Sequence, residues 1–341
     1  MIYDTISNLE FNLKFLLDTI LLKDGHYTNI AKGTTIRGYD ASKLVLDTES
    51  SSDFGGISGC QVWQSPFMQW VYESGITLNQ APFISGKIPP YLASGIYVNG
   101  TLFTNAVSGS QFYIDYINGR VIFSGTGIPG NSLVQADYSF KEFRTDFVDG
   151  TTAQEDINAY SETYLKDNPI ASNVIVYPSG DYRTTTFPCI YIEVDGPSDF
   201  RVLELGNYSS KEVFDVYFHI YALNRVQRNV AKEVIKNRIF TSLPLIDYNY
   251  APIPLSGLQN TLPPNPITYE TLLTNPTING NKVVSHTYYV ENGSISNFSV
   301  IKNYPTNVMS KNPFFSATAI LNIIVENVSP AGRISPNPYL T

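Results

Sequence analysis

The stretch KEVFDVYFHIYA, residues 211–222, decides the fold of the second half of the chain. Apolar residues alternate with polar and aromatic ones throughout it, and a period of two predicts a β-strand with one apolar face. That face comprises Phe214, Val216, Phe218, Ile220 and Ala222. A helix is expected directly afterwards, over residues 223–240, with Leu223, Val226, Val230, Val234 and Ile235 facing inward. Strand, short turn and helix predict one α/β layer.

Outward from this unit, the pattern predicts an α+β domain over residues 170–341. Further strands are expected at 174–177, 188–195, 201–205 and 316–325. The segment 241–281 is rich in Pro and Asn and is long for a structureless loop, which indicates an extended arm or a binding loop. Residues 282–304 are expected to form a long hairpin arm about Asn292-Gly293.

Residues 1–35 are expected to hold an N-terminal helix and its lead-in. Apolar residues recur at spacings of three and four over residues 1–23, the period of an amphipathic helix. Additional apolar residues widen this stripe beyond what a solvent-facing helix needs. Packing within the helix's own domain is the favoured interpretation, and docking on another subunit is the alternative. Under that alternative Leu9, Leu13 and Leu16 are candidate interface residues.

Residues 36–148 are expected to form a β-rich domain, a barrel or sandwich of antiparallel strands. Asn99-Gly100 and Asn118-Gly119 each separate two apolar runs, and Asn-Gly suits the positive φ angles of a type I′ hairpin turn. Further strands are expected at 61–63, 68–72 and 133–140, and a linker helix is expected over 149–169. The whole chain is therefore predicted to be α+β.

Composition limits the classes of function. The chain has 341 residues, enough for two or three domains, and only 15% are charged against about 25% in ordinary soluble domains. The net charge is −8, from 22 basic and 30 acidic residues, which argues against a broadly basic nucleic-acid binder. Abundant Tyr and Asn with few charges favour an assembly subunit whose surfaces are covered by neighbours.

Targeting signals and cysteines narrow the class of function only slightly. Two cysteines, Cys60 and Cys189, are too few for a disulfide framework or a thiolate metal site. The N-terminus lacks the basic region of a secretory signal, and apolar runs of about 18 residues are absent, so neither export nor membrane insertion is expected.

Catalytic motifs are weak in this sequence. Residues 125–130 match the spacing G-x-G-x-x-G, but Pro129 intrudes and a strand follows, so a turn between strands is expected. The three histidines, His26, His219 and His286, have no metal-binding spacing. Glu155-Asp156 and the Glu193/Asp195 pair are acidic neighbours of the kind that solvated surfaces carry. No catalytic residue, cofactor or metal is therefore expected, and the protein is not expected to be an enzyme.

One charge feature stands out. Arg225, Arg228, Lys232 and Lys236 recur at spacings of three and four on the helix after the long strand. They are candidates for contact with an acidic neighbouring subunit or a phosphate backbone. A solvated outer helix face is the simpler interpretation.

The order PCIYIEV (188–194), ELG (204–206), EVFDVYFHIYA (212–222) and an Arg-rich helix resembles the neck and tail-terminator proteins of contractile-tailed bacteriophages. The resemblance implies a virion structural protein that forms a ring, a hexamer or a dodecamer, at the head–tail junction. It also implies that neighbours join through a sheet edge or a long hairpin, so Tyr289 and Asn292 are further candidate interface residues.

The same resemblance implies the partners and the location. Neighbouring connector and tail proteins are the expected partners, DNA passes only as cargo, and no membrane is involved. The location is the virion neck or tail, with the host cytoplasm during assembly. The alternative is a baseplate or receptor-binding tail protein that binds host surface glycans, and a glycan-cleaving enzyme is a third, less supported hypothesis.

Overall fold

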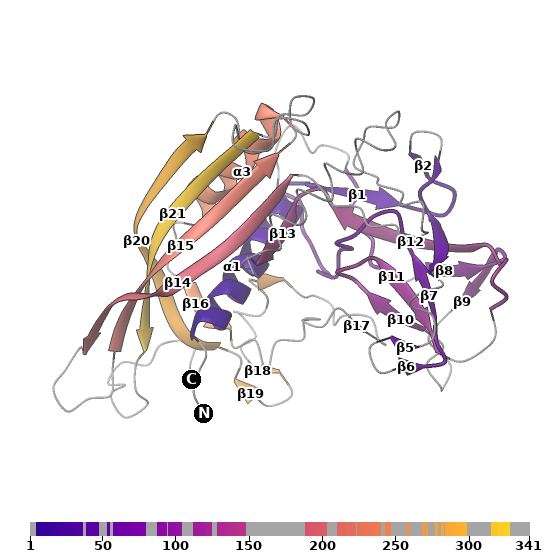
Figure 1. Cartoon of the computed structure of the whole chain (residues 1–341), viewed down its shortest axis with the longest axis horizontal. Coiled ribbons are helices and arrows are strands. Elements are labelled where there is room, and N and C mark those ends of the chain that lie inside the picture. Colours follow the sequence, from indigo (N-terminus) through magenta and orange to yellow (C-terminus); the bar gives the residue numbers. More distant parts are fainter. Residues whose placement is uncertain are drawn as a thin grey trace, which may run out of the picture.

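The computed structural model describes residues 5–36, 39–47, 53–54, 57–79, 87–93, 95–103, 112–124, 128–147, 188–202, 210–222, 224–239, 243–246, 258–259, 268–269, 271, 277–278, 281–282, 284–298 and 315–327. In these ranges the chain is mostly β-structure with two helices, α1 (Thr5–Lys23) and α3 (Arg225–Arg238). Two large sheets form two lobes, and both helices lie with the sheet of long strands (Figure 1). The expected linker helix over 149–169 and strand over 174–177 fall outside the described residues.

The first sheet has nine antiparallel strands, which confirms the expected β-rich lobe in outline. Its order is β17-β10-β11-β7-β4-β12-β8-β9, and β1 also pairs with β12. The strands are β1 (Tyr27–Ile30), β4 (Lys43–Asp47), β7 (Gln61–Gln64), β8 (Gly95–Val98), β9 (Thr101–Phe103), β10 (Phe112–Asp115), β11 (Arg120–Phe123), β12 (Val134–Lys141) and β17 (Leu258–Gln259). Two short pairs accompany them, β2 (Thr35–Ile36) with β3 (Tyr39–Asp40) and β5 (Asp53–Phe54) with β6 (Ile57–Ser58).

Both Asn-Gly hairpins form, with different turns. Asn99 and Gly100 have φ angles of 49° and 84° and join β8 to β9 in two residues, as expected for type I′. The second loop has four residues, because Asp115 pairs with Arg120 across β10 and β11. In that loop the Asp115 carboxylate accepts from the backbone and side-chain nitrogens of Asn118 at 3.0 and 2.8 Å, and Gly119 has a φ of 63°.

The expected strand at 68–72 is wrong. This segment makes a single antiparallel bridge, between Trp70 and Phe140, and Gln69 has a φ of 56°. The Gln69 and Trp70 amides donate to the carbonyls of Ile117 and Tyr116 in the β10–β11 loop, at 2.8 and 2.7 Å. Tertiary hydrogen bonds to that loop therefore replace a regular ladder here.

The second sheet is curled and has six strands in the order β13-β14-β15-β21-β20-β16 (Figure 1). Its strands are β13 (Arg144–Phe147), β14 (Cys189–Val202), β15 (Ser210–Ala222), β16 (Leu243–Ile246), β20 (Val284–Phe298) and β21 (Phe315–Asn327). All pairings are antiparallel except that of β13 with β14. β13 follows the first sheet directly, so the boundary expected at residue 148 lies after a strand that already belongs to the second sheet.

The strand predicted over residues 211–222 and the helix predicted directly after it are confirmed as β15 and α3. All five apolar residues predicted for one face of β15 are buried, four of them (Phe214, Val216, Phe218 and Ile220) in the common core, where Ala231, Val234 and Ile235 of α3 also lie. The helix begins after Asn224, whose side chain accepts from the Gln227 amide at 2.9 Å, and Ala231 and Ile235 are buried. Val226 was expected inward but is 71% exposed, because it lies about 2.5 turns from Ile235, on the opposite side of the helix.

α1 is buried on all sides. Its apolar residues from Leu9 to Leu22 are at most 9% exposed, and Asn12 and Asp18 are buried as well. A helix that is apolar around most of its circumference belongs inside a protein. The wide apolar stripe thus reflects packing within the chain, the interpretation favoured from the sequence.

The hairpin arm expected over 282–304 is wrong. Residues 284–298 form one strand, β20, which pairs with β21 from Thr287↔Glu326 to Phe298↔Ser316. Asn292-Gly293 lies at an irregularity of this pairing, between Val290 and Asn292, where one extra residue enters the strand. Asn292 and Gly293 themselves pair with Asn322 and Leu321, so the dipeptide continues the strand beside this bulge and does not turn the chain back.

The Pro-rich segment 241–281 is anchored where it is described. β16 pairs with β20, β17 adds to β10 of the first sheet, and β18 (Thr277–Ile278) pairs with β19 (Asn281–Lys282). Tyr269 is fully buried against Phe15 of α1, with ring centroids 5.9 Å apart. These described parts belong to both lobes, which is contrary to a free arm.

Candidate functional site

The interface residues predicted on α1 are covered by the chain itself. Leu9 and Leu13 are fully buried and Leu16 is 5% exposed, all within the common core. Tyr289 and Asn292 lie in β20, paired with Ile324 and Asn322 of β21. The structure therefore places one group in the interior and the other in a sheet.

The basic residues of α3 do not form one exposed stripe. Arg225 and Lys236 are exposed and Lys232 is half-buried, but Arg228 is buried beside the core face of the helix. Arg228 shares that face with Ala231 and Ile235, at spacings of three and seven. The expectation of four exposed cations is thus wrong for Arg228, because the helix faces the sheet through this side.

The three histidines lie in different parts of the fold, and one of them contacts a carboxylate of the Glu193/Asp195 pair. His219 Nε2 lies 2.7 Å from Glu193 Oε2 across the β14–β15 pair, and its ring stacks near Tyr217. His26 lies 3.9 Å from Glu142, and His286 is in β20. Among the described residues, no three His, Cys, Asp or Glu side chains cluster as metal ligands would. Glu155-Asp156 falls outside the described residues.

A cluster of buried charges lies where α1 meets the first sheet. Lys141, the last residue of β12, places its amine 2.8 Å from Asp18 Oδ2 and 2.6 Å from Glu73 Oε1. The two carboxylate side chains are fully buried and the lysine side chain is 4% exposed. Tyr72 lies against the same amine, with 4.6 Å between Nζ and the ring centroid.

Two further groups complete this charge cluster. Lys14 Nζ lies 3.4 Å from Asp18 Oδ2 and donates to Thr145 Oγ1 at 2.9 Å and to the Thr145 carbonyl. The Thr145 hydroxyl donates to Asp18 Oδ1. We call Lys14, Asp18, Glu73, Lys141 and Thr145 the junction cluster, because they join α1, β12 and β13.

Burial and charge act in opposite directions on these groups. Burial alone would raise the pKa of Asp18, but the charges of Lys14 and Lys141 and hydrogen bonds from Lys141 and Thr145 hold it below its usual value. Burial raises the pKa of Glu73, and the charge of Asp18 adds to this against the attraction of Lys141. Loss of water would lower the pKa of Lys141, but the two carboxylates raise it. Glu73 is therefore the carboxylate of the cluster that accepts a proton more readily.

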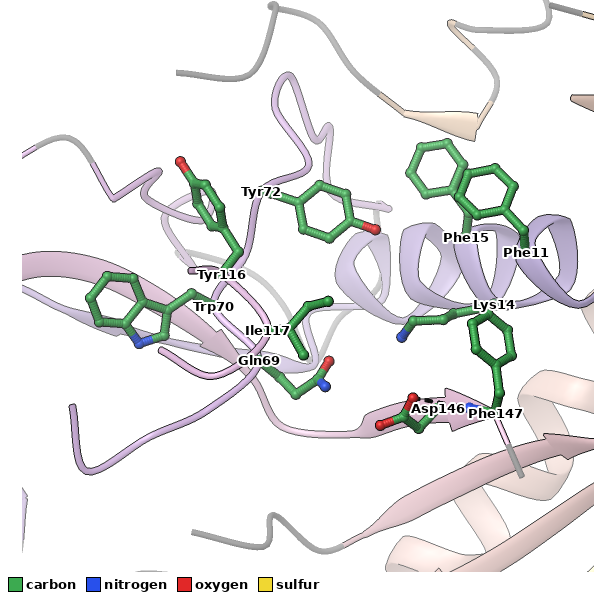
Figure 2. Close-up of a pocket in the computed structure, with 10 residues that line it drawn as sticks. All are labelled: Phe11, Lys14, Phe15, Gln69, Trp70, Tyr72, Tyr116, Ile117, Asp146 and Phe147. Atoms are coloured by element: carbon green, nitrogen blue, oxygen red, sulfur yellow. Dashed lines mark hydrogen bonds between the residues drawn. The ribbon is translucent and has the colours of Figure 1, made fainter. Parts of the chain in front are cut away.

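A pocket of about 140 Å³ adjoins the junction cluster. Figure 2 shows Lys14 and Phe15 of α1 and Phe147 of β13 on one side, with Gln69 and Trp70 on the other. The remaining lining residues are Phe11, Tyr72, Tyr116, Ile117 and Asp146. Mostly aromatic walls with one amine give the pocket the character of a small apolar site.

The two charged groups that line the pocket are already bonded within the protein. The amine of Lys14 contacts Asp18 and Thr145, and Asp146 accepts from Arg144 Nη2 at 2.9 Å. The pocket therefore presents mostly apolar surface, with the Gln69 amide and the Tyr116 hydroxyl as further polar groups in its lining, and the paired charges of this region lie in the junction cluster beside it.

The sequence contained one signal for this site. Lys14 and Asp18 are charged residues at a spacing of four within an otherwise apolar helix, and buried charges need partners. The partners Glu73 and Lys141 have no local signature. They are 55 and 123 residues from Asp18, so their meeting is a property of the fold.

No family model matches the chain, and no curated protein matches it significantly. In the part of the chain that the structure describes, neither helix is long and apolar enough to cross a membrane. A function must therefore be argued from the geometry and from the sequence resemblance.

Proposed function

We propose that this protein is a structural subunit of a bacteriophage virion and forms a ring at the head–tail junction, as a neck or tail-terminator protein. The outer edge of β20 carries the proposal. β16 pairs with β20 only from Val284 to Tyr288, and among the described residues no strand pairs with this side from Tyr289 to Phe298. Such an edge is a template for pairing with another chain.

The terminal strand on this side of the sheet, β16, has its own backbone groups covered. Asn12 of α1 donates to the Ile246 carbonyl at 2.7 Å and accepts from the Ile246 amide at 2.8 Å. The Asn12 side chain thus bonds both the amide and the carbonyl of Ile246 in the terminal strand β16, as a neighbouring strand would. The contrast favours the β20 edge, which includes Tyr289 and Asn292, as the place where a second copy adds.

The resemblance supports the same reading. Among the residues that carry it, those that the structure describes belong to β14, β15 and α3, part of one curled sheet with a helix on one face (Figure 1), while 204–206 lie outside the described residues. In this role the partners are copies of the chain together with connector and tail proteins, DNA is passing cargo, and assembly takes place in the host cytoplasm. The role requires neither turnover nor a cofactor.

The oligomeric state tests the proposal directly. Native mass measurement on the full chain should give a hexamer or a dodecamer. A monomer at every concentration would contradict the ring, and a trimer would favour the alternative, a receptor-binding tail protein.

Proline variants test the β20 edge. Neighbouring strand residues direct their N–H groups to opposite edges, and proline removes that donor. Of Ser294→Pro and Ile295→Pro, the one whose N–H faces outward should abolish the ring while the monomer stays folded. Rings with both variants would show that this edge is not the interface.

The exposed cations of α3 provide a second test. Lys236→Glu should weaken assembly at low salt more than at high salt, because exposed ion pairs are screened. Lys43→Glu makes the same charge change at an exposed position of the first sheet and should leave assembly unchanged. Equal effects of the two variants would show that this face of α3 is solvated and contacts no neighbouring subunit.

A further inference from the structure

The junction cluster holds an amine and a carboxylate in contact inside the protein, without a role in the proposed ring. Lys141 Nζ lies 2.8 Å from Asp18 Oδ2, and a second carboxylate, Glu73, lies 2.6 Å from the same nitrogen. We propose that Lys141 and Asp18 condense to an amide, an intramolecular isopeptide bond, with Glu73 as the group that relays the proton.

Proximity and exclusion of water favour this condensation. Reacting atoms held about 3–3.5 Å apart gain the large rate advantage of an intramolecular reaction. The side chains of Asp18 and Glu73 are fully buried, and the Tyr72 ring covers the lysine amine. Amide formation replaces a desolvated ion pair with a neutral group, and a buried ion pair carries a large desolvation cost.

The hydrogen bonds identify Asp18 as the carboxylate that is attacked. The Thr145 hydroxyl donates to its Oδ1, and the Lys14 amine lies 3.4 Å from its Oδ2. Donors in these positions stabilise the negative oxygen of a tetrahedral intermediate, as an oxyanion hole does. Glu73 accepts from Lys141 and, at 3.2 Å, from the Tyr72 amide, and it interacts with the Tyr72 hydroxyl, but among its described contacts no second amine corresponds to Lys14.

The other property of Glu73 suits a proton relay. Burial raises its pKa, so it takes up a proton more readily than an exposed glutamate does. It contacts the nitrogen that must lose protons for attack to occur. A general base within hydrogen-bond distance of that proton fulfils the geometric requirement.

The reaction balances without an oxidant or cofactor. The Lys141 ammonium passes one proton to Glu73, and the free amine forms a bond from Nζ to Cγ of Asp18. The tetrahedral intermediate then loses one carboxyl oxygen as water, which takes the proton from Glu73 and a second proton from the nitrogen. One ammonium and one carboxylate become one amide and one water, and Glu73 is regenerated.

The bond would tie the core helix to the first sheet. Asp18 lies near the end of α1, which packs in the core of the second sheet, and Lys141 ends β12 of the first sheet. The cross-link would close a long loop of the chain and would prevent α1 from leaving the junction under load. This inference does not depend on the proposed ring.

Intact-mass spectrometry of the full chain tests it. The Lys141→Arg variant retains a positive charge but has no nucleophilic amine. Its mass should exceed that of the wild type by the substitution plus one water molecule, a difference that is independent of processing at the N-terminus. A peptide map should then locate one cross-linked pair of peptides, containing Asp18 and Lys141.

Two glutamate variants separate the proton relay from general effects. Glu73→Gln keeps the shape of the side chain and should leave most of the protein uncrosslinked. Glu142→Gln removes the carboxylate of the residue that follows Lys141. This side chain is partly exposed and contacts Lys87 and Thr28, so its replacement should leave cross-linking complete. Equal cross-linking in the two variants would refute the role of Glu73.

Three outcomes for the wild type would overturn the proposal, and these need no variant to fold. They are the full sequence mass, a lost water that maps to another site such as Asp24-Gly25, and a link from Lys141 to Glu73 in place of Asp18. The first leaves the junction cluster as an ion network only.

Discussion

Replacing Gly119 with alanine should destabilise the protein by about 2–5 kcal/mol, because two separate penalties meet at this position. Its φ of 63° is a left-handed conformation, which costs an L-residue about 1–2 kcal/mol. A Cβ added there would lie 2.1 Å from the Phe67 carbonyl oxygen and 2.9 Å from Trp70 Nε1. Moving those groups adds about 1–3 kcal/mol, the usual cost of overpacking. Trp70 Nε1 also donates to the Phe67 carbonyl at 3.0 Å, so the shift disturbs a buried hydrogen bond.

Gly59 is the matched control. Its φ is 67°, and an added Cβ would meet no atom within 4 Å, so Gly59→Ala carries only the backbone penalty of about 1–2 kcal/mol. Urea unfolding followed by tryptophan fluorescence measures both, since the two tryptophans, Trp63 and Trp70, are buried and report on the first sheet. The Gly119 variant should lose about 1–3 kcal/mol more than the Gly59 variant. Costs equal within about 0.5 kcal/mol would refute the close approach of Gly119 to Phe67.

Two further predictions concern buried polar groups. Asn12→Leu leaves the amide and carbonyl of Ile246 without their side-chain partner and should lower the free energy of unfolding by about 2–4 kcal/mol in chemical denaturation. The control, Asn237→Leu on the exposed side of α3, should lower it by less than about 0.5 kcal/mol, and similar losses in the two variants would show that the Asn12 bonds do not hold β16. Burial raises the pKa of Asp115 above 3.8 in the folded protein. The stability that this group contributes is therefore present below pH 3.8 and is lost as the pH rises through the folded-state pKa. The variant Asp115→Asn keeps an acceptor for Asn118 and does not titrate. The wild type should therefore be more stable relative to this variant at about pH 4 than at about pH 7, and a difference that grows with pH would contradict the burial of the carboxylate.

The features predicted correctly from the sequence are local. The period of two over residues 211–222 identified β15 and its buried face, and Asn99-Gly100 identified a two-residue hairpin turn. The apolar residues of α1 indicated a helix that packs within the chain. In each case residues within a few positions of one another specify the backbone conformation, so the pattern is sufficient.

The errors arose where one local pattern is compatible with two conformations. Asn292-Gly293 was predicted to be a turn but pairs with β21 directly after a bulge in β20, since an Asn-Gly pair also occurs beside strand irregularities. Arg228 was placed on an exposed stripe by its spacing, and only the direction from which α3 meets the sheet shows that this position is buried.

The sequence by itself therefore determined the strand and helix periods, the tight turns and the low charge of this protein. The tertiary structure decided which strands pair and which charges meet. Lys141 reaches Asp18 across 123 residues and Glu73 across 68, and β17 joins β10 of the other lobe. Such contacts depend on how whole elements pack, since burying a lysine between two carboxylates is favourable only when the fold brings all three charged groups into contact.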